Sequence, residues 1–148
     1  MASRILWIDN DRLFLGAHKL RLELEGYLVT QSFTLKDGAH ELETAKYDLL
    51  ILDVMMPVAE DEIEEYPQSQ TNGGRQAGLV FYRRYKKIIE EKKIKILVFT
   101  IREDTKLREM FIGEGLLDDN IMTKELGGDT AVFLARVNQL LQTNGSKV

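Results

Sequence analysis

Residues 49–57 read LLILDVMMP, a run of four apolar residues followed by the carboxylate Asp53 and, a turn later, by a proline. An unbroken run of branched residues, rather than an alternating one, is typical of a strand that is buried on both faces. Helices that cover both faces of a parallel sheet produce this burial. The segment therefore predicts an internal strand of an α/β domain, with an acid at its carboxyl end.

The same pattern recurs on both sides of this segment. Clear apolar runs occupy Ile5 to Ile8 and Ile94 to Phe99, and weaker candidate strands occupy Tyr27 to Phe33 and Ile121 to Thr123. The stretches between them have apolar residues spaced three to four apart, which predicts amphipathic helices. The sequence thus predicts a doubly wound (βα)5 fold, a five-stranded parallel sheet with helices on both faces.

This fold would occupy residues 1–142 as a single domain, followed by a polar tail at 143–148. The final helix should begin with Asp129 or Thr130 as its cap. We expect one apolar stripe on the first helix and one on the last to face the sheet. These stripes comprise Leu13, Ala17, Leu20 and Leu24 on the first helix, and Ala131, Leu134, Val137 and Leu141 on the last.

Composition narrows the class of protein. The chain has 148 residues, a formal charge of −4 and no cysteine, so disulfides, thiolate metal sites and cysteine nucleophiles are excluded. Direct DNA binding is not expected, because it needs a basic surface. No apolar run reaches membrane-spanning length, and Asp9 and Asp11 interrupt the N-terminal apolar stretch. We therefore expect a cytoplasmic protein that carries no secretion signal and does not associate with a membrane.

The connection after the third strand is unusually long. About 18 residues separate Pro57 from Gln76, where a strand-to-helix connection normally takes about 2–6. This insertion, residues 58–75, begins with a cluster of acids and continues into the turn-forming stretch QSQTNGG, so we expect a mobile acidic loop. The helix behind it, Ala77 to Lys92, carries basic residues that could partly neutralise the acids, although we favour a solvated face for them. These basic residues are Arg83, Arg84, Lys86 and Lys87.

The residues that end the strands form a consistent set. In a doubly wound sheet, ligands bind beyond the carboxyl ends of the strands. The first strand ends in Asp9-Asn10-Asp11, the third in Asp53, the fourth in Thr100 and the fifth in Lys124. Crowded carboxylates repel one another unless a cation neutralises them, and oxygen ligands suit Mg²⁺. A carboxylate such as Asp53 can attack phosphorus to give an acyl phosphate, and Lys124 and Thr100 fit the role of holding the phosphoryl oxygens.

Four segments resemble the signature strand ends of response regulator receiver domains: RILWIDND at 4–11, LLILDVMMP at 49–57, ILVFT at 96–100 and IMTK at 121–124. The resemblance spans nearly the whole chain and implies a flavodoxin-like receiver fold.

The same resemblance implies a role for each site residue. Asp53 would be the phosphoacceptor. Mg²⁺ would be held by Asp9, Asn10, Asp53 and the backbone carbonyl of Met55. Thr100 would be the switch hydroxyl, and Lys124 would pair with the phosphate.

Four positions depart from the receiver pattern. Asn10 stands where the family usually has a second acid, so we expect weaker Mg²⁺ binding unless Asp11 supplies the missing charge. Ile101 stands where the family prefers a small residue; its bulk should narrow access to the phosphoryl group and slow dephosphorylation. Ile121 replaces an aromatic residue that often turns inward on activation, and Glu125 replaces the customary proline after the lysine.

Each site residue also has a simpler structural interpretation. Asn10 and Asp11 could cap the first helix, and we favour the cap for Asp11. The strand-end aspartates could be turn residues, Thr100 an ordinary strand former and Lys124 a surface charge, but their coincidence favours function. The two histidines, His18 and His40, lack ligand-spaced partners and are assigned no role.

The resemblance implies a single-domain response regulator. It would receive a phosphoryl group on Asp53 from a phosphohistidine of a sensor histidine kinase or a histidine phosphotransfer protein, and would signal to a downstream protein through a changed binding surface. It would not be an enzyme, apart from self-phosphorylation and autodephosphorylation. The sequence does not set its oligomeric state.

Two alternatives remain open. The first is a degenerate receiver that acts as a phosphorylation-independent interaction module, a hypothesis motivated by Asn10, Ile101, Ile121 and the insertion. The second is an aspartyl-phosphate phosphohydrolase. The phosphohydrolase is the weaker hypothesis, because Met55 occupies the position where haloacid dehalogenases carry their second acid.

Overall fold

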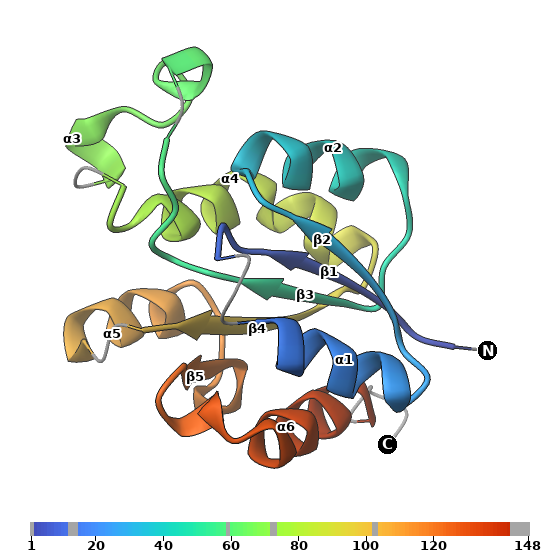
Figure 1. The fold of residues 1–148 in the computed structure, drawn as a ribbon. Helices are drawn as coiled ribbons and strands as arrows, with labels where there is room; N and C mark the ends of the chain where they lie inside the picture. Colours follow the sequence, from blue (N-terminus) through green and yellow to red (C-terminus); the bar gives the residue numbers. More distant parts are fainter. Residues whose placement is uncertain (1, 12–14, 59, 72–73, 102–103, 143–148) are drawn as a thin grey trace.

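Five parallel strands form one sheet in the order β2-β1-β3-β4-β5 (Figure 1). The computed structural model describes residues 2–11, 15–58, 60–71, 74–101 and 104–142. The strands are β1 (Arg4–Ile8), β2 (Leu28–Ser32), β3 (Leu49–Leu52), β4 (Lys95–Thr100) and β5 (Ile121–Thr123). This is the doubly wound order in which the chain changes direction between β1 and β3. The predicted fold class is confirmed, and the five strands lie within two residues of their expected bounds.

Helices cover both faces of the sheet (Figure 1). The α-helices are α1 (Gly16–Leu24), α2 (Leu35–Thr44), α3 (Gln68–Thr71), α4 (Ala77–Glu91), α5 (Thr105–Gly113) and α6 (Thr130–Gln142). Three short 3-10 turns are η1 (Glu60–Glu62), η2 (Asp118–Asn120) and η3 (Leu126–Gly128). None of the described helices is long and apolar enough to cross a membrane.

Two hydrophobic cores lie on opposite faces of the sheet, because successive side chains of a strand point to opposite sides. One core packs α2, α4 and α5 against the face that includes Ile8 and Leu52. The other packs α1 and α6 against the face that includes Trp7 and Phe99. Every residue of β3 is fully buried, as its unbroken apolar run predicts.

The predicted stripe on α1 is wrong, and the predicted stripe on α6 is right for two of its four residues. On α1 the sheet-facing residues are Leu15, His18 and Leu22, whereas Ala17 is exposed and Leu20 and Leu24 are 55% and 76% exposed. Leu13 lies outside the described residues. Apolar residues occur at helical spacing on both sides of α1, so spacing alone did not identify the buried side.

On the last helix, Leu134 and Val137 of the predicted stripe are buried as expected. Its buried residues are Phe133, Leu134, Val137 and Leu140, whereas Ala131 is exposed and Leu141 is half-buried. Its cap is confirmed: the Asp129 carboxylate accepts a hydrogen bond from the backbone N–H of Ala131 at 2.8 Å.

The insertion after β3 contains η1 and α3 and projects from the domain before the start of α4 (Figure 1). Tyr66 is buried in the core that holds α2 and α4, and the Arg84 guanidinium lies 5.3 Å from its ring centroid. Arg84 also donates to the backbone carbonyl of Glu65 at 2.7 Å, and Lys36 pairs with Asp61 at 3.0 Å. The described part of the insertion is therefore anchored at its centre. Its mobility remains a prediction.

For the basic residues of α4 we expected a solvated face, with neutralisation of the insertion's acids as the alternative. Arg83 and Lys86 pair with Glu114 at the end of α5, at 2.7 and 3.7 Å, rather than with the acids of the insertion. Arg84 reaches the insertion, but through a backbone carbonyl and an aromatic ring. Among the described residues, these contacts link α4 to α5 and to the insertion.

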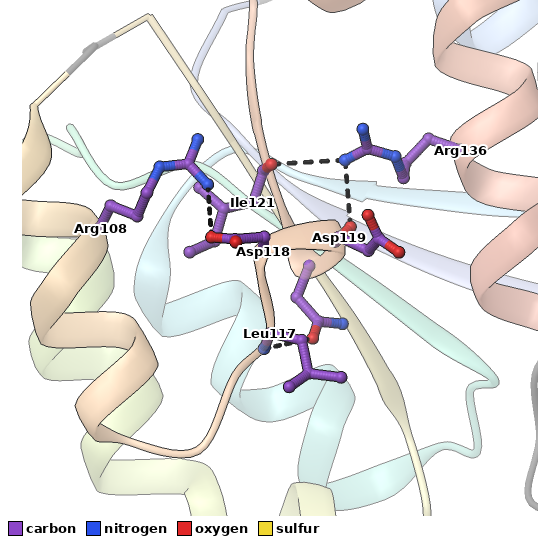
Figure 2. Close-up of polar contacts among 7 residues, drawn as sticks. Arg108, Leu117, Asp118, Asp119, Ile121 and Arg136 are labelled. Carbon is purple, nitrogen blue, oxygen red and sulfur yellow. Dashed lines mark hydrogen bonds and ion pairs between the residues drawn. The ribbon is translucent and has the colours of Figure 1, made fainter.

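The turn η2 connects α5, β5 and α6, as Figure 2 shows. Arg108 of α5 pairs with Asp118 at 3.2 Å. Arg136 of α6 donates to the backbone carbonyls of Asp119 and Ile121, at 3.1 and 3.4 Å. These contacts hold the start of β5, and therefore the strand that leads to Lys124, between two helices.

Candidate functional site

The carboxyl edge of the sheet brings together the predicted side chains. Asp9 and Asp53 follow β1 and β3, Thr100 ends β4 and Lys124 follows β5; all four are buried. The Lys124 ammonium Nζ lies 2.8 Å from Asp9 Oδ2 and 3.6 Å from Asp53 Oδ2. One cation therefore contacts both carboxylates.

Sheet register explains why the two carboxylates are neighbours. β1 and β3 pair with Ile8 opposite Leu52, so the residues that follow each strand leave the sheet side by side. The backbone N–H of Asp53 donates to the Ile8 carbonyl at 3.0 Å, which extends the pairing to the site. The start of α4 also packs closely here, because a Cβ on Gly78 would lie 2.3 Å from the Asp53 carbonyl oxygen.

Lys124 is fixed by its own backbone and by β4. Its N–H donates to the Thr100 carbonyl at 2.7 Å, and Thr100 pairs with Thr123 in the last register of the sheet. The hydroxyl of Thr123 accepts from the backbone N–H of Leu126 at 3.2 Å, which closes the turn after the lysine. The ammonium also lies 6.0 Å from the ring centroid of Phe99, within the range of a cation–π contact.

Burial and mutual repulsion disturb the ionisation of both acids. Burial, followed by the negative charge of Asp9, raises the pKa of Asp53 to about 7, and the Lys124 ammonium opposes this rise. Burial also raises the pKa of Asp9, although Lys124 favours its charged form. With both acids ionised, two negative charges face one positive charge. Such a site favours an additional cation.

The residues present fit a Mg²⁺ ion with few protein ligands. Mg²⁺ commonly uses one or two carboxylates and keeps several waters. Asp9 and Asp53 supply two buried carboxylates, and Met55 lies two residues beyond Asp53 with its N–H 3.3 Å from Asp53 Oδ1. Among the described residues, no three acidic, histidine or cysteine side chains converge as a complete metal cage. Position 10, beside Asp9, is an exposed asparagine and adds no acid.

Asp11 is not the cap of α1 that we expected. The helix begins at Gly16 with Leu15 as its N-cap residue, so Asp11 lies too far upstream. Instead, the backbone N–H of Asp11 donates to Asp9 Oδ1 at 3.0 Å. The turn after β1 thereby orients the Asp9 carboxylate.

Two departures from the receiver pattern lie near the site. Ile101 directly follows Thr100 and is 64% exposed, so its effect on access remains a prediction. Ile121 is buried and borders a cavity of about 10 Å³, which Thr100, Leu107 and Phe111 also line. An aliphatic side chain thus occupies the place of the expected aromatic.

Sequence reasoning missed the aromatic layer beneath the site. Trp7 stacks on Phe133 with ring centroids 5.3 Å apart, and Phe99 lies against both rings. His18 joins this cluster. The apolar runs identified these strands as buried, but they carried no signal that the aromatics gather under Lys124.

Comparison with protein-family models gave no match, and comparison with curated proteins gave none either. Solved structures are similar over nearly the full length. A response regulator receiver domain protein (CheY-like) from Methanospirillum hungatei has a TM-score of 0.74 at 18% identity, covering 100% of both chains. The receiver domain of an HD domain-containing protein from Pseudomonas fluorescens has 0.72 at 18%, covering 96% of each. A response regulator from Thermotoga maritima has 0.69 at 20%, covering 97% of this chain and 100% of its own.

Proposed function

We propose that this chain, which has the fold of response regulator receiver domains, accepts a phosphoryl group on Asp53 and signals through a changed protein-binding surface. The observation that carries the proposal is the position of Lys124, whose ammonium contacts both Asp53 and Asp9 at the carboxyl edge of the sheet. The fold is shared by proteins of many functions, so the argument depends on this site.

The proposed donor is a phosphohistidine on a sensor histidine kinase or a histidine phosphotransfer protein. A carboxylate oxygen of Asp53 attacks phosphorus, the P–N bond to the donor imidazole breaks, and the imidazole leaves and takes up a proton. The new P–O bond makes an acyl phosphate on Asp53. Only the ionised carboxylate is a nucleophile, so a pKa of about 7 leaves Asp53 partly protonated near neutrality until further positive charge reaches the site.

Lys124 would neutralise charge on the phosphoryl oxygens as they reach Asp53, and the Thr100 hydroxyl would hold one of these oxygens. Both groups belong to the ends of neighbouring strands, so their approach to the phosphoryl group would alter the β4–α5 and β5–α6 loops. A downstream protein would read this altered surface.

A bound Mg²⁺ would neutralise phosphoryl oxygens during transfer. The residues that would hold it are Asp9, Asp53, the carbonyl of Met55 and the side-chain amide of Asn10. Asp9 carries most of this role, because its carboxylate is fully buried and is oriented by the N–H of Asp11.

A second candidate function is a phosphorylation-independent interaction module. It is favoured by the exposed amide at position 10, which removes one charge from the proposed cation site, and by the aliphatic Ile121. A phosphohydrolase is less well supported, since Met55 offers no acid to a leaving group.

The test is incubation with Mg²⁺ and acetyl phosphate, a small-molecule phosphoryl donor, followed by intact-mass measurement. We expect one phosphoryl adduct on the parent protein and none on Asp53→Asn. A folded parent without an adduct would support the interaction module instead. The variant Ile101→Ala then distinguishes a blocked donor from an unreactive carboxylate, because only a blocked donor would regain the adduct.

A further inference from the structure

His18 is a buried histidine that bonds the loop after Lys124. It lies on α1, is 3% exposed, and its Nε2 is 2.8 Å from the backbone carbonyl oxygen of Gly127. A carbonyl oxygen only accepts hydrogen bonds, so Nε2 carries the hydrogen and donates it. The bond joins residues that are 109 positions apart in the sequence.

The His18 ring also contacts the aromatic layer under the site. It meets the edge of Phe133 at a centroid distance of 5.1 Å and lies 5.9 Å from the Phe99 centroid. Phe99 is the ring near which the Lys124 ammonium lies. His18 therefore touches both the aromatic ring beside the lysine and the backbone that follows it.

The turn η3 has little freedom to move without moving Lys124. A Cβ on Gly127 would lie 2.6 Å from Phe99 Cε1 and 2.6 Å from Met122 Sδ, so the backbone of this turn packs directly on both side chains. The turn is tied to β4 and β5 by the bonds from the N–H groups of Lys124 and Leu126. His18 adds a bond from α1, the helix that follows the Asp9 loop.

We propose that His18 is a positioning residue: by holding Gly127, it keeps the Lys124 ammonium over the Asp9 and Asp53 carboxylates. The bond connects α1, the helix that follows the loop carrying Asp9, with the turn that follows Lys124. The consequence of this bond for phosphoryl transfer rests on the proposed function. The effect of the bond on the position of Lys124 is independent of the proposed function.

A histidine that only filled space would behave differently from a positioning histidine. Phenylalanine has a similar planar ring and would preserve the packing on Phe99 and Phe133, but it has no donor for the Gly127 carbonyl. Glutamine places an amide nitrogen near the position of the histidine Nε2 and retains a donor. The pair His18→Phe and His18→Gln therefore separates volume from hydrogen bonding.

The first experiment measures the rate of phosphorylation by acetyl phosphate as a function of donor concentration. We expect His18→Phe to lower the maximal rate about tenfold with little change in the half-saturating concentration, because misplacing a charge-stabilising group affects the transfer step. His18→Gln should recover most of the parental rate. In the background Lys124→Met, His18→Phe should have no further effect.

The second experiment needs no phosphorylation and measures hydrogen exchange of the Lys124 amide, which bonds the Thr100 carbonyl. We expect about tenfold faster exchange in His18→Phe, relative to amides of β1, and parental exchange in His18→Gln.

If the parent takes up no phosphoryl group, the proposed function fails and this experiment alone decides the inference. Parental exchange in His18→Phe would overturn the positioning role, and a parental maximal rate would overturn its part in transfer. His18→Leu, which also lacks the donor, replaces His18→Phe if that variant does not fold.

Discussion

The charge balance of the site depends on a few single residues. Lys124 supplies one positive charge to two buried carboxylates, and position 10 supplies none, because it is asparagine. A buried excess of negative charge is costly unless it is protonated or neutralised by a cation. We therefore expect the identity of residue 10 to affect cation affinity, even though the residue is exposed.

At position 10 we predict that Asn10→Asp raises Mg²⁺ affinity by roughly tenfold, because another negative charge near the cation adds a Coulomb attraction of about 1 kcal/mol or more. Fluorescence of Trp7, the single tryptophan of the chain and two residues before Asp9, can follow the titration. Asn10→Ala is the matched control and should bind no more tightly than the parent. Parental affinity in Asn10→Asp would show that position 10 takes no part in binding.

The principal site residues could be predicted because parallel register determines where strand ends lie. Once Ile5 to Ile8 and Leu49 to Leu52 are recognised as adjacent strands, Asp9 and Asp53 must emerge together. The role of Asp11 could not be predicted in this way. Its place depends on where α1 starts, and the helix begins at Gly16 without a side-chain cap.

Among the elements, the insertion is the least regular, and Tyr66 is its anchor. The side chain is 2% exposed, packs in the core that holds α2 and α4, and lies beneath the Arg84 guanidinium. Acidic and turn-forming residues dominate the sequence around it, so hydropathy suggested only a loop. One buried aromatic within a polar stretch is a weak signal when its partners are distant in sequence.

We predict that Tyr66→Ala lowers the free energy of unfolding by about 3 kcal/mol, since it removes a buried aromatic side chain and leaves a cavity. The change should also expose the insertion to a glutamate-specific protease, which can cut at Glu60, Glu64 or Glu65. Tyr66→Phe retains the ring and should remain close to the parent in both measurements. Equal protease resistance in Tyr66→Ala and the parent would mean that the insertion is held by other contacts.

The rotation of α1 and α6 about their axes was the part of the fold that the sequence predicted worst. Both helices were located correctly, but α1 turns Leu15, His18 and Leu22 toward the sheet and leaves Leu20 and Leu24 exposed. Two apolar rows run along α1, and His18 lowers the hydropathy of the row that is buried. The choice between the rows is made by the aromatic layer, into which His18 fits as a flat ring with a donor.

For the whole molecule, the buried acids make stability depend on pH. The pKa of Asp53 rises from 3.8 to about 7 on folding, so the folded state binds this proton more tightly than the unfolded state. The resulting stabilisation is fully present below the pKa of Asp53 in the unfolded state. It is lost as the pH rises through the pKa of Asp53 in the folded state. Asp9 acts in the same direction, because its pKa is also raised.

We therefore predict that, without Mg²⁺, the contribution of Asp53 to the free energy of unfolding falls between about pH 4 and pH 7. Asp53→Asn removes this contribution, so at pH 8 it should be more stable than the parent by on the order of 2 kcal/mol, with a smaller difference at pH 4. Chemical denaturation at several pH values measures the difference. Glu109→Gln, at an exposed acid on α5, is the control and should keep the parental pH dependence. Parallel curves for Asp53→Asn and the parent would contradict the prediction.

The overall topology was predictable because three internal strands carry unbroken apolar runs and the connecting segments have helical spacing. The two outer strands gave weaker signals, since β2 is only partly buried and β5 has three residues. Their assignment relied on the order of the elements along the chain. The insertion did not disturb the prediction, because it falls in a connection and not within an element.

The close approach of the two ends of that connection has an evolutionary consequence. Gly74 has a φ of 93°, and a Cβ at this position would lie 2.9 Å from the Met56 carbonyl oxygen, so the chain leaves the domain and returns at nearly the same point. A segment with such a narrow base can lengthen or shorten without shifting β3 or α4, provided that a side chain in the place of Tyr66 still fills the core. The position is a natural acceptor for grafted sequences, and a recognition peptide placed there would be displayed next to the carboxyl edge of the sheet.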